Sequence, residues 1–105
     1  MQFSSNSCIA IHLKDLEDAE KFYSNVMGFK LKKKSKDQLE YDTGHFLLYI
    51  NKSSEIQSPI PSFTVKNMIE AKNRLKESGC KILIDRKNSL YFQDPFGIVY
   101  DLIEG

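Results

Sequence analysis

The chain contains an internal repeat with a period of about half its length, and this repeat limits the folds open to it. Asp15 and Asn67 stand at the same point of the two copies, each just before a stretch with helical periodicity. Gly28 and Gly79 follow those two stretches. The two glycines lie 51 residues apart, whereas Asp15 and Asn67 lie 52 residues apart. Although few residues are identical, the order of caps and apolar positions agrees, so we predict two copies of one supersecondary unit.

The first copy predicts a strand, a helix and three further strands. Cys8–Leu13 alternates like a strand, and Asp15 is placed to cap a helix that ends at Gly28. The helix carries an apolar stripe with spacings of three and four residues: Leu16, Ala19, Phe22, Tyr23, Val26 and Met27. The three expected strands that follow are Phe29–Lys34, Gln38–Thr43 and Phe46–Ile50.

The second copy predicts the same βαβββ order. A short strand, Ser62–Val65, precedes a helix capped by Asn67 and ended by Gly79. Three strands follow, at Cys80–Asp85, Ser89–Gln93 and Ile98–Ile103. We therefore expect one α+β domain over residues 1–105, with module one at about 7–51, a linker at 52–61 and module two at about 62–104.

The composition excludes several classes of function. With 15 basic and 14 acidic residues, the chain has no global charge that favours nucleic acid. No apolar run approaches the roughly 20 residues needed to span a bilayer, and no secretion signal is visible, so no membrane is expected. Two cysteines do not form a disulfide framework, which favours the reducing cytoplasm. The lysine-rich stretch at residues 30–36 is interpreted as a solvated strand edge.

Two motifs carry a family resemblance. The stretch Leu13–Phe29 (LKDLEDAEKFYSNVMGF) and the stretch Phe92–Glu104 (FQDPFGIVYDLIE) resemble the glyoxalase/bleomycin-resistance/extradiol-dioxygenase, or vicinal-oxygen-chelate, superfamily. The resemblance implies two βαβββ modules that form a curled mixed sheet around a cavity, with the helices outside. In short relatives of this kind a second subunit often completes the cavity, so a homodimer is expected.

The resemblance also implies where a metal ion would be bound. Metal-using members place ligands on the inner face of four strands, and the matching positions here are Cys8, Leu47 or Tyr49, Ile60 and Asp101. Only Asp101 is a convincing donor, Cys8 is a weaker one, and Ile60 offers none. We therefore predict no metal cofactor; a divalent metal is the alternative.

Two polar residues are the strongest candidates for binding a small-molecule ligand. His12 shares a face with Cys8, where it either contacts a ligand or bonds to a neighbouring group at the cavity rim. Asp101 lies in an apolar strand, and charged side chains are seldom buried without a partner. It therefore marks either a polar binding site or an ion pair that organises the sheet.

The remaining candidates have weaker signals, and each has a structural alternative. Tyr49, Tyr91 and Tyr41 are suited to aromatic pocket walls or to ordinary core packing. Ser62 and Thr64 would add hydroxyl groups to the cavity, and Cys8 is either a thiol in the site or a small apolar residue. The predicted ligand-binding set is His12, Tyr49, Ser62, Thr64, Asp101, Cys8 and Tyr91.

Three functions fit these observations. The residues favour a metal-free glyoxalase-like protein that binds a small organic molecule, with no catalytic residue assigned. The first alternative is a metal-dependent lyase, isomerase or dioxygenase of the same superfamily. The second alternative is a structural or protein-interaction domain whose cavity is filled by its own side chains, such as Leu47, Ile60 and Val99.

Overall fold

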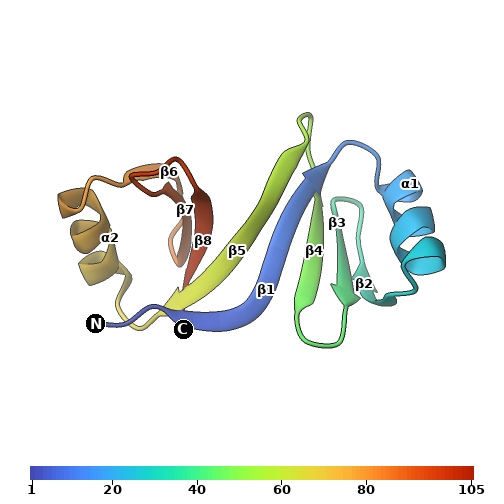
Figure 1. Cartoon of the computed structure of the whole chain (residues 1–105), viewed down its shortest axis with the longest axis horizontal. Helices are drawn as coiled ribbons and strands as arrows, with labels where there is room; N and C mark the ends of the chain where they lie inside the picture. Colours follow the sequence, from blue (N-terminus) through green and yellow to red (C-terminus); the bar gives the residue numbers. More distant parts are fainter. The chain divides into compact units, whose positions relative to one another are not determined.

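The chain forms two structural units, each with four β-strands and a helical segment (Figure 1). The computed structural model describes residues 1–105, except for the side chain of Ser58. The first unit is Ser7–Pro59, and the second unit combines Met1–Asn6 with Ile60–Gly105. Each unit is described separately below.

The first unit has the strand order β2-β3-β4-β1. These strands are β1 (Ser4–Leu13), β2 (Lys30–Lys34), β3 (Gln38–Asp42) and β4 (Leu47–Lys52). β1 runs parallel to β4, and the other neighbours are antiparallel. A helical segment, α1 (Leu16–Glu20) with η1 (Lys21–Val26), connects β1 to β2. This unit therefore has the predicted βαβββ order.

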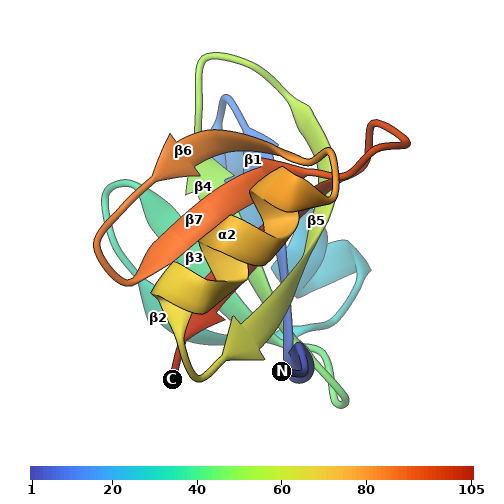
Figure 2. The same ribbon diagram turned by 90° about the vertical axis from the view of Figure 1, so that its left-hand side faces the viewer.

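The second unit repeats this arrangement with the order β5-β8-β7-β6. Its strands are β5 (Gln57–Val65), β6 (Lys81–Asp85), β7 (Ser89–Gln93) and β8 (Val99–Glu104). β5 runs parallel to β8, and β7 is antiparallel to both of its neighbours. The helix α2 (Met68–Glu77) crosses one face of this sheet (Figure 2). The predicted duplicated α+β fold is confirmed in both units.

Each unit has an apolar core between its helix and its sheet. The core of the first unit consists of Ile11, Ala19, Leu39, Tyr41, Leu48 and Ile50. The core of the second unit consists of Val65, Met68, Ala71, Leu75, Leu90, Phe92 and Leu102. Alternate residues of each strand point into these cores, so the residues between them lie on the face away from the helix.

The predicted helix caps are present. The Asp15 carboxylate accepts hydrogen bonds from the backbone N–H groups of Glu17 and Asp18 at 3.0 and 3.1 Å. Asn67 caps α2 by accepting from Glu70 N at 3.0 Å. Gly28 and Gly79 have φ angles of +73° and +87°, which favour glycine after a helix. Among the described residues, no helix is both long and apolar enough to span a membrane.

The first helix differs from the uniform α-helix that its periodicity predicts. After Glu20 the segment Lys21–Val26 is a π-helix, and Met27 N donates to Phe22 O at 3.0 Å. A π turn accommodates one extra residue in a helix. This extra residue explains why the two terminal glycines are one residue closer than the two helix caps.

Two strands begin earlier than predicted. β5 begins at Gln57, so the linker expected at residues 52–61 is wrong over its second half. The sequence did not predict this part of the strand because it contains Pro59 and Pro61. Proline has no backbone N–H to donate to a neighbouring strand, so it argues against a strand. Pairing of β5 with β8 begins only after them, at Ser62. β1 similarly begins at Ser4, four residues before the predicted start at Cys8.

Candidate functional site

The face of the second sheet that points away from α2 carries a group of polar side chains. Asp101 on β8 is paired in register with Ser62 on β5 and with Tyr91 on β7, so the three side chains share one face. Thr64 lies two residues after Ser62 and on the same side of β5. Sheet register therefore brings together four of the predicted ligand-binding residues.

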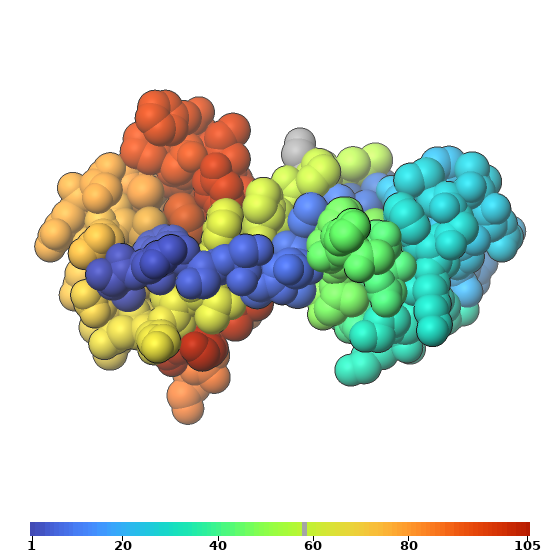
Figure 3. Space-filling model, turned by 60° about the horizontal axis from the view of Figure 1, so that its bottom comes forward, coloured from blue at the N-terminus to red at the C-terminus, as the bar shows by residue number. Residues whose placement is uncertain are grey.

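A chain of hydrogen bonds fixes the Asp101 carboxylate. Ser62 Oγ donates to Asp101 Oδ2 at 2.9 Å and accepts from Asn6 Nδ2 at 2.7 Å. The same amide nitrogen is 3.2 Å from Thr64 Oγ1. Asn6 belongs to the segment Met1–Asn6, which is part of this unit and appears in dark blue against the yellow end of β5 in Figure 3. The site is thus completed by a segment far from β5 in sequence.

The surroundings of Asp101 raise its pKa above that of an exposed aspartate. Burial raises the pKa of the Asp101 carboxyl, and the Ser62 hydrogen bond and the Arg86 charge only partly oppose this effect. The Arg86 guanidinium lies over the Tyr91 ring, 5.5 Å from its centroid. Burial, followed by the Asp101 charge, raises the pKa of Tyr91. A carboxylate, a phenol ring and a guanidinium are therefore neighbours on this face.

The first unit has a second polar group on the equivalent face. Tyr49 on β4 is paired with Glu40 on β3 and with Ala10 on β1, which places it on the same face as Cys8. Burial raises the pKa of Tyr49 to about 12, with further contributions from the charge of Glu40 and from Cys8. Glu40 is only 8% exposed, and its presence is one of the causes that raise the pKa of the Tyr49 hydroxyl.

The two groups are related by the internal repeat. Glu40 and Tyr49 are cross-strand partners on β3 and β4, and Tyr91 and Asp101 are cross-strand partners on β7 and β8. Each unit therefore holds one tyrosine and one carboxyl at equivalent places, with the two residue types exchanged. Because this pair occurs in both units, the face of the strands that points away from the helix is called the polar face.

The remaining sequence candidates are placed as follows. His12 lies on the polar face of the first unit, opposite Asn51. Tyr41 is not a pocket wall: it is fully buried in the core, and its hydroxyl is 2.8 Å from Ser24 Oγ. Its place on β3 gives it the parity of Leu39, which points toward the helix.

Three residues of the polar faces were missed by the sequence interpretation. Glu40 was not among the sequence candidates, although it stands at the position of the repeat that Tyr91 occupies in the second copy. Asn6 precedes the first predicted strand, and nothing in the sequence indicates its contact with Ser62. Arg86 lies in a turn where lysine and arginine are ordinary.

The residues do not fit the metal site of the superfamily. Among the described residues, no three histidine, cysteine, aspartate or glutamate side chains gather where they could hold a metal ion. Ile60, at one of the four expected ligand positions, is an apolar side chain that is only 3% exposed. Ser62 and Asn6 surround Asp101 with hydroxyl and amide groups in place of imidazole or carboxylate ligands.

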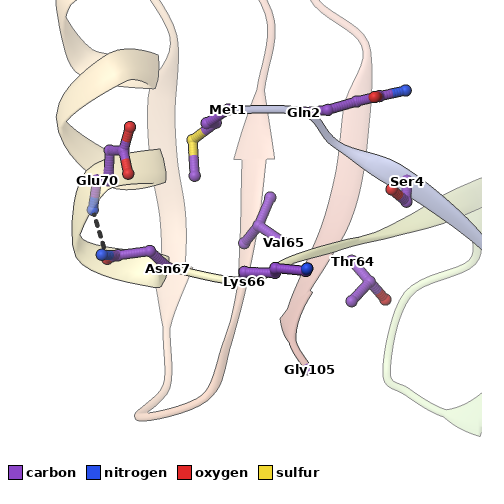
Figure 4. Close-up of a pocket in the computed structure, with 9 residues that line it drawn as sticks. All are labelled: Met1, Gln2, Ser4, Thr64, Val65, Lys66, Asn67, Glu70 and Gly105. Carbon is purple, nitrogen blue, oxygen red and sulfur yellow. Dashed lines mark hydrogen bonds between the residues drawn. The ribbon is translucent and has the colours of Figure 1, made fainter.

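A separate pocket of about 470 Å³ lies at the start of α2 (Figure 4). Lys66, Asn67 and Glu70 line it, together with Thr64 from the predicted set. Two backbone donors at the start of α2 are already engaged, because Asn67 accepts from Glu70 N and Glu104 Oε2 accepts from Met68 N at 2.8 Å. This pocket therefore offers little to an anionic ligand.

Residues 7–102 match the family model of the glyoxalase/bleomycin resistance protein/dioxygenase superfamily. The chain belongs to this superfamily. The match covers both βαβββ units and confirms the family resemblance of the two sequence motifs.

Solved structures of an extradiol dioxygenase have the same fold. A variant of homoprotocatechuate 2,3-dioxygenase from B. fuscum matches with a TM-score of 0.75 and 19% identity, over 98% of this chain and 33% of that chain. The anaerobic complex of the Brevibacterium fuscum enzyme with 3,4-dihydroxyphenylacetate matches with a TM-score of 0.75 and 18% identity, over 98% and 37%. The chain thus spans about a third of these enzymes, and at this identity the likeness concerns the fold alone.

Proposed function

We propose that this glyoxalase-like protein binds a small organic molecule without a metal ion, on the polar face of its second unit. The observation that carries the proposal is the half-buried Asp101 carboxyl, held by Ser62 and Asn6 in a three-residue hydrogen-bonded chain. Positioning a carboxyl group in a partly buried place is costly unless it meets donors there. A ligand hydroxyl, amide or amine would supply such a donor.

The neighbours of Asp101 indicate the kind of ligand. Tyr91 presents an aromatic ring beside the carboxyl group, and Arg86 places a positive charge over that ring. A planar molecule with one hydrogen-bond donor and one anionic or acceptor group would meet all three side chains. The equivalent polar face of the first unit, with Cys8, His12 and Tyr49, is proposed separately as a place where a ligand binds. We also propose a cytoplasmic location, because two cysteines in the sequence do not make the disulfide framework of a small secreted domain.

An NMR binding screen with small aromatic alcohols, amines and carboxylates tests this proposal. We expect at least one compound to shift the resonances of Ser62, Tyr91 and Asp101 in a saturable way. Ser62→Ala should weaken that compound roughly threefold to tenfold, because it removes the hydrogen bond that orients Asp101. Asp37→Asn, in an exposed turn of the first unit, is the matched control and should leave binding unchanged. A screen in which no compound contacts this face would contradict the proposal.

The alternative function is that of a metal-dependent enzyme, because the superfamily includes dioxygenases. Calorimetric titration of chelator-treated protein with zinc, nickel, manganese and iron(II) separates the two. We expect no ion to bind more tightly than about millimolar, since Asp101 stands among hydroxyl and amide groups. Micromolar binding of one ion per chain, abolished by Asp101→Ala, would replace the metal-free proposal with the enzyme.

A further inference from the structure

The second unit has an aromatic pocket on the side of its sheet opposite to the polar face. The pocket has a volume of about 220 Å³ and is lined by Phe3, Phe63, Phe92 and Tyr100. The last three residues are direct sequence neighbours of Ser62, Tyr91 and Asp101, so strand alternation turns them to the other face. Phe92 is only 5% exposed, which makes it the most buried of the four lining residues. This pocket is therefore independent of the proposed polar site.

The four rings present their faces in different directions. Phe92 and Tyr100 have ring centroids 5.4 Å apart with planes inclined by 29°. Phe63 is 5.8 Å from Tyr100 at 52°, and Phe3 is 6.4 Å from Phe92 at 86°, close to perpendicular. Because the ring planes are inclined at such different angles, the rings that line the pocket do not form one flat wall. This arrangement is suited to a compact, roughly spherical group rather than to a flat one.

The chemistry of the lining selects among compact groups. The face of an aromatic ring carries partial negative charge and attracts a cation within about 6 Å of its centroid. A primary ammonium would lose its water hydrogen bonds here, because the only polar side-chain group of the lining is the Tyr100 hydroxyl. A quaternary ammonium makes no hydrogen bonds to lose, and its methyl groups pack directly against the rings. The pocket is also smaller than the roughly 300 Å³ at which sites for drug-sized ligands begin.

We propose that this aromatic pocket binds the trimethylammonium head group of an organic cation. The purely aromatic lining of the pocket supports a cation over a neutral apolar ligand. Val65, Leu90 and Leu102 are fully enclosed in the core, and only aromatic side chains line the pocket. A neutral group would pack against aliphatic and aromatic walls alike, whereas a cation gains specifically from ring faces.

A pair of probes of equal shape tests the charge requirement. Choline and its neutral isostere 3,3-dimethylbutan-1-ol differ at one atom, where nitrogen replaces carbon. In NMR titrations that observe the aromatic resonances, we expect saturable shifts of Phe3, Phe63, Phe92 and Tyr100 with choline. Choline should bind roughly tenfold more tightly than the isostere. Equal affinities would overturn the proposal in favour of a purely apolar pocket, and the absence of saturable shifts with choline would overturn it altogether.

Substitutions then localise the binding. Phe63→Leu keeps apolar bulk but removes one ring face, so choline affinity should fall roughly fivefold to tenfold. Phe22→Leu is the matched control, because Phe22 is an aromatic residue of the first unit, about half exposed. If Phe63→Leu loses its native circular dichroism spectrum, Tyr100→Leu replaces it. Unchanged choline affinity in a folded pocket variant would contradict the assignment, and it would leave the proposed polar site unaffected.

Discussion

At the scale of single residues, Asp101 links stability to pH. Its pKa is raised by burial, so its contribution to stability is full below the ordinary pKa of an aspartate and is lost as pH rises through the raised value. Asp101→Asn removes this loss while an amide oxygen can still accept from Ser62. We therefore expect the melting temperature of Asp101→Asn, relative to that of the original chain, to increase from acidic to neutral pH.

Thermal unfolding followed by circular dichroism at a series of pH values measures this difference. Asp37→Asn should show no comparable trend, because its side chain lies in an exposed turn. A melting-temperature difference that runs in the opposite direction with pH would show that hydrogen bonds to the ionised carboxylate outweigh its burial.

Tyr49 gives a second residue-scale prediction. Burial is the largest cause of its pKa of about 12, and the Glu40 charge comes next. Among the five tyrosines of the chain, we expect Tyr49 to ionise late in an alkaline absorbance titration. Glu40→Gln should lower the pKa of Tyr49 without returning it to 10, since burial remains. The folded state should lose stability from Tyr49 as pH rises from about 10 through about 12.

The control for this titration is Glu55→Gln, in the exposed loop before β5. It should leave the absorbance curve unchanged. Superimposable curves for the original chain and Glu40→Gln would mean that Glu40 does not act on the Tyr49 hydroxyl.

At the scale of elements, the π-helix η1 and strand β3 depend on each other. The hydroxyl of fully buried Tyr41 lies 2.8 Å from Ser24 Oγ and donates to Glu20 O at 3.4 Å. Removing a partner from a buried hydrogen bond costs about 1–3 kcal/mol. We expect Tyr41→Phe to lower the free energy of unfolding by about 1–2 kcal/mol, measured by urea denaturation.

A double-mutant cycle separates this hydrogen bond from general packing. Combining Tyr41→Phe with Ser24→Ala should cost less than the sum of the two single substitutions, because both remove the same contact. Tyr23→Phe, from the same aromatic cluster, serves as the control. Strictly additive effects would show that the helix and the strand are not coupled through this pair.

At the scale of the whole molecule, the two sheets end in edge strands of different character. β2 is rich in lysine, which discourages pairing with another chain. β6 instead exposes Leu83 and Ile84, which are 48% and 43% accessible. If the expected homodimer forms, its natural contact is therefore the β6 edge, where apolar side chains and unpaired backbone groups meet.

Sedimentation analysis tests the dimer. We expect a dimer for the original chain and a monomer for Leu83→Lys, because a charged side chain at this edge would have to be buried on pairing. Lys32→Glu on β2 is the control and should remain dimeric. A monomeric original chain at all concentrations would remove the homodimer from consideration.

The sequence by itself determined the duplicated βαβββ fold, because its signals are local. Strand alternation, helical stripes, the caps at Asp15 and Asn67 and the terminal glycines each depend on a few adjacent residues. Ser62, Thr64, Tyr91 and Asp101 could be grouped for the same reason, since parity along a strand assigns each side chain to a face.

Only the tertiary structure decided which of these side chains touch and what completes them. Asn6 reaches Ser62 across 56 positions of sequence, and Ser62 reaches Asp101 across 39. Glu40, which pairs with Tyr49 on β4, is only 8% exposed, and alternation within β3 cannot reveal this burial. The aromatic pocket likewise gathers rings from β5, β7, β8 and the segment before β1. Such contacts depend on strand pairing between distant segments. They cannot be predicted from the periodicity of any one segment.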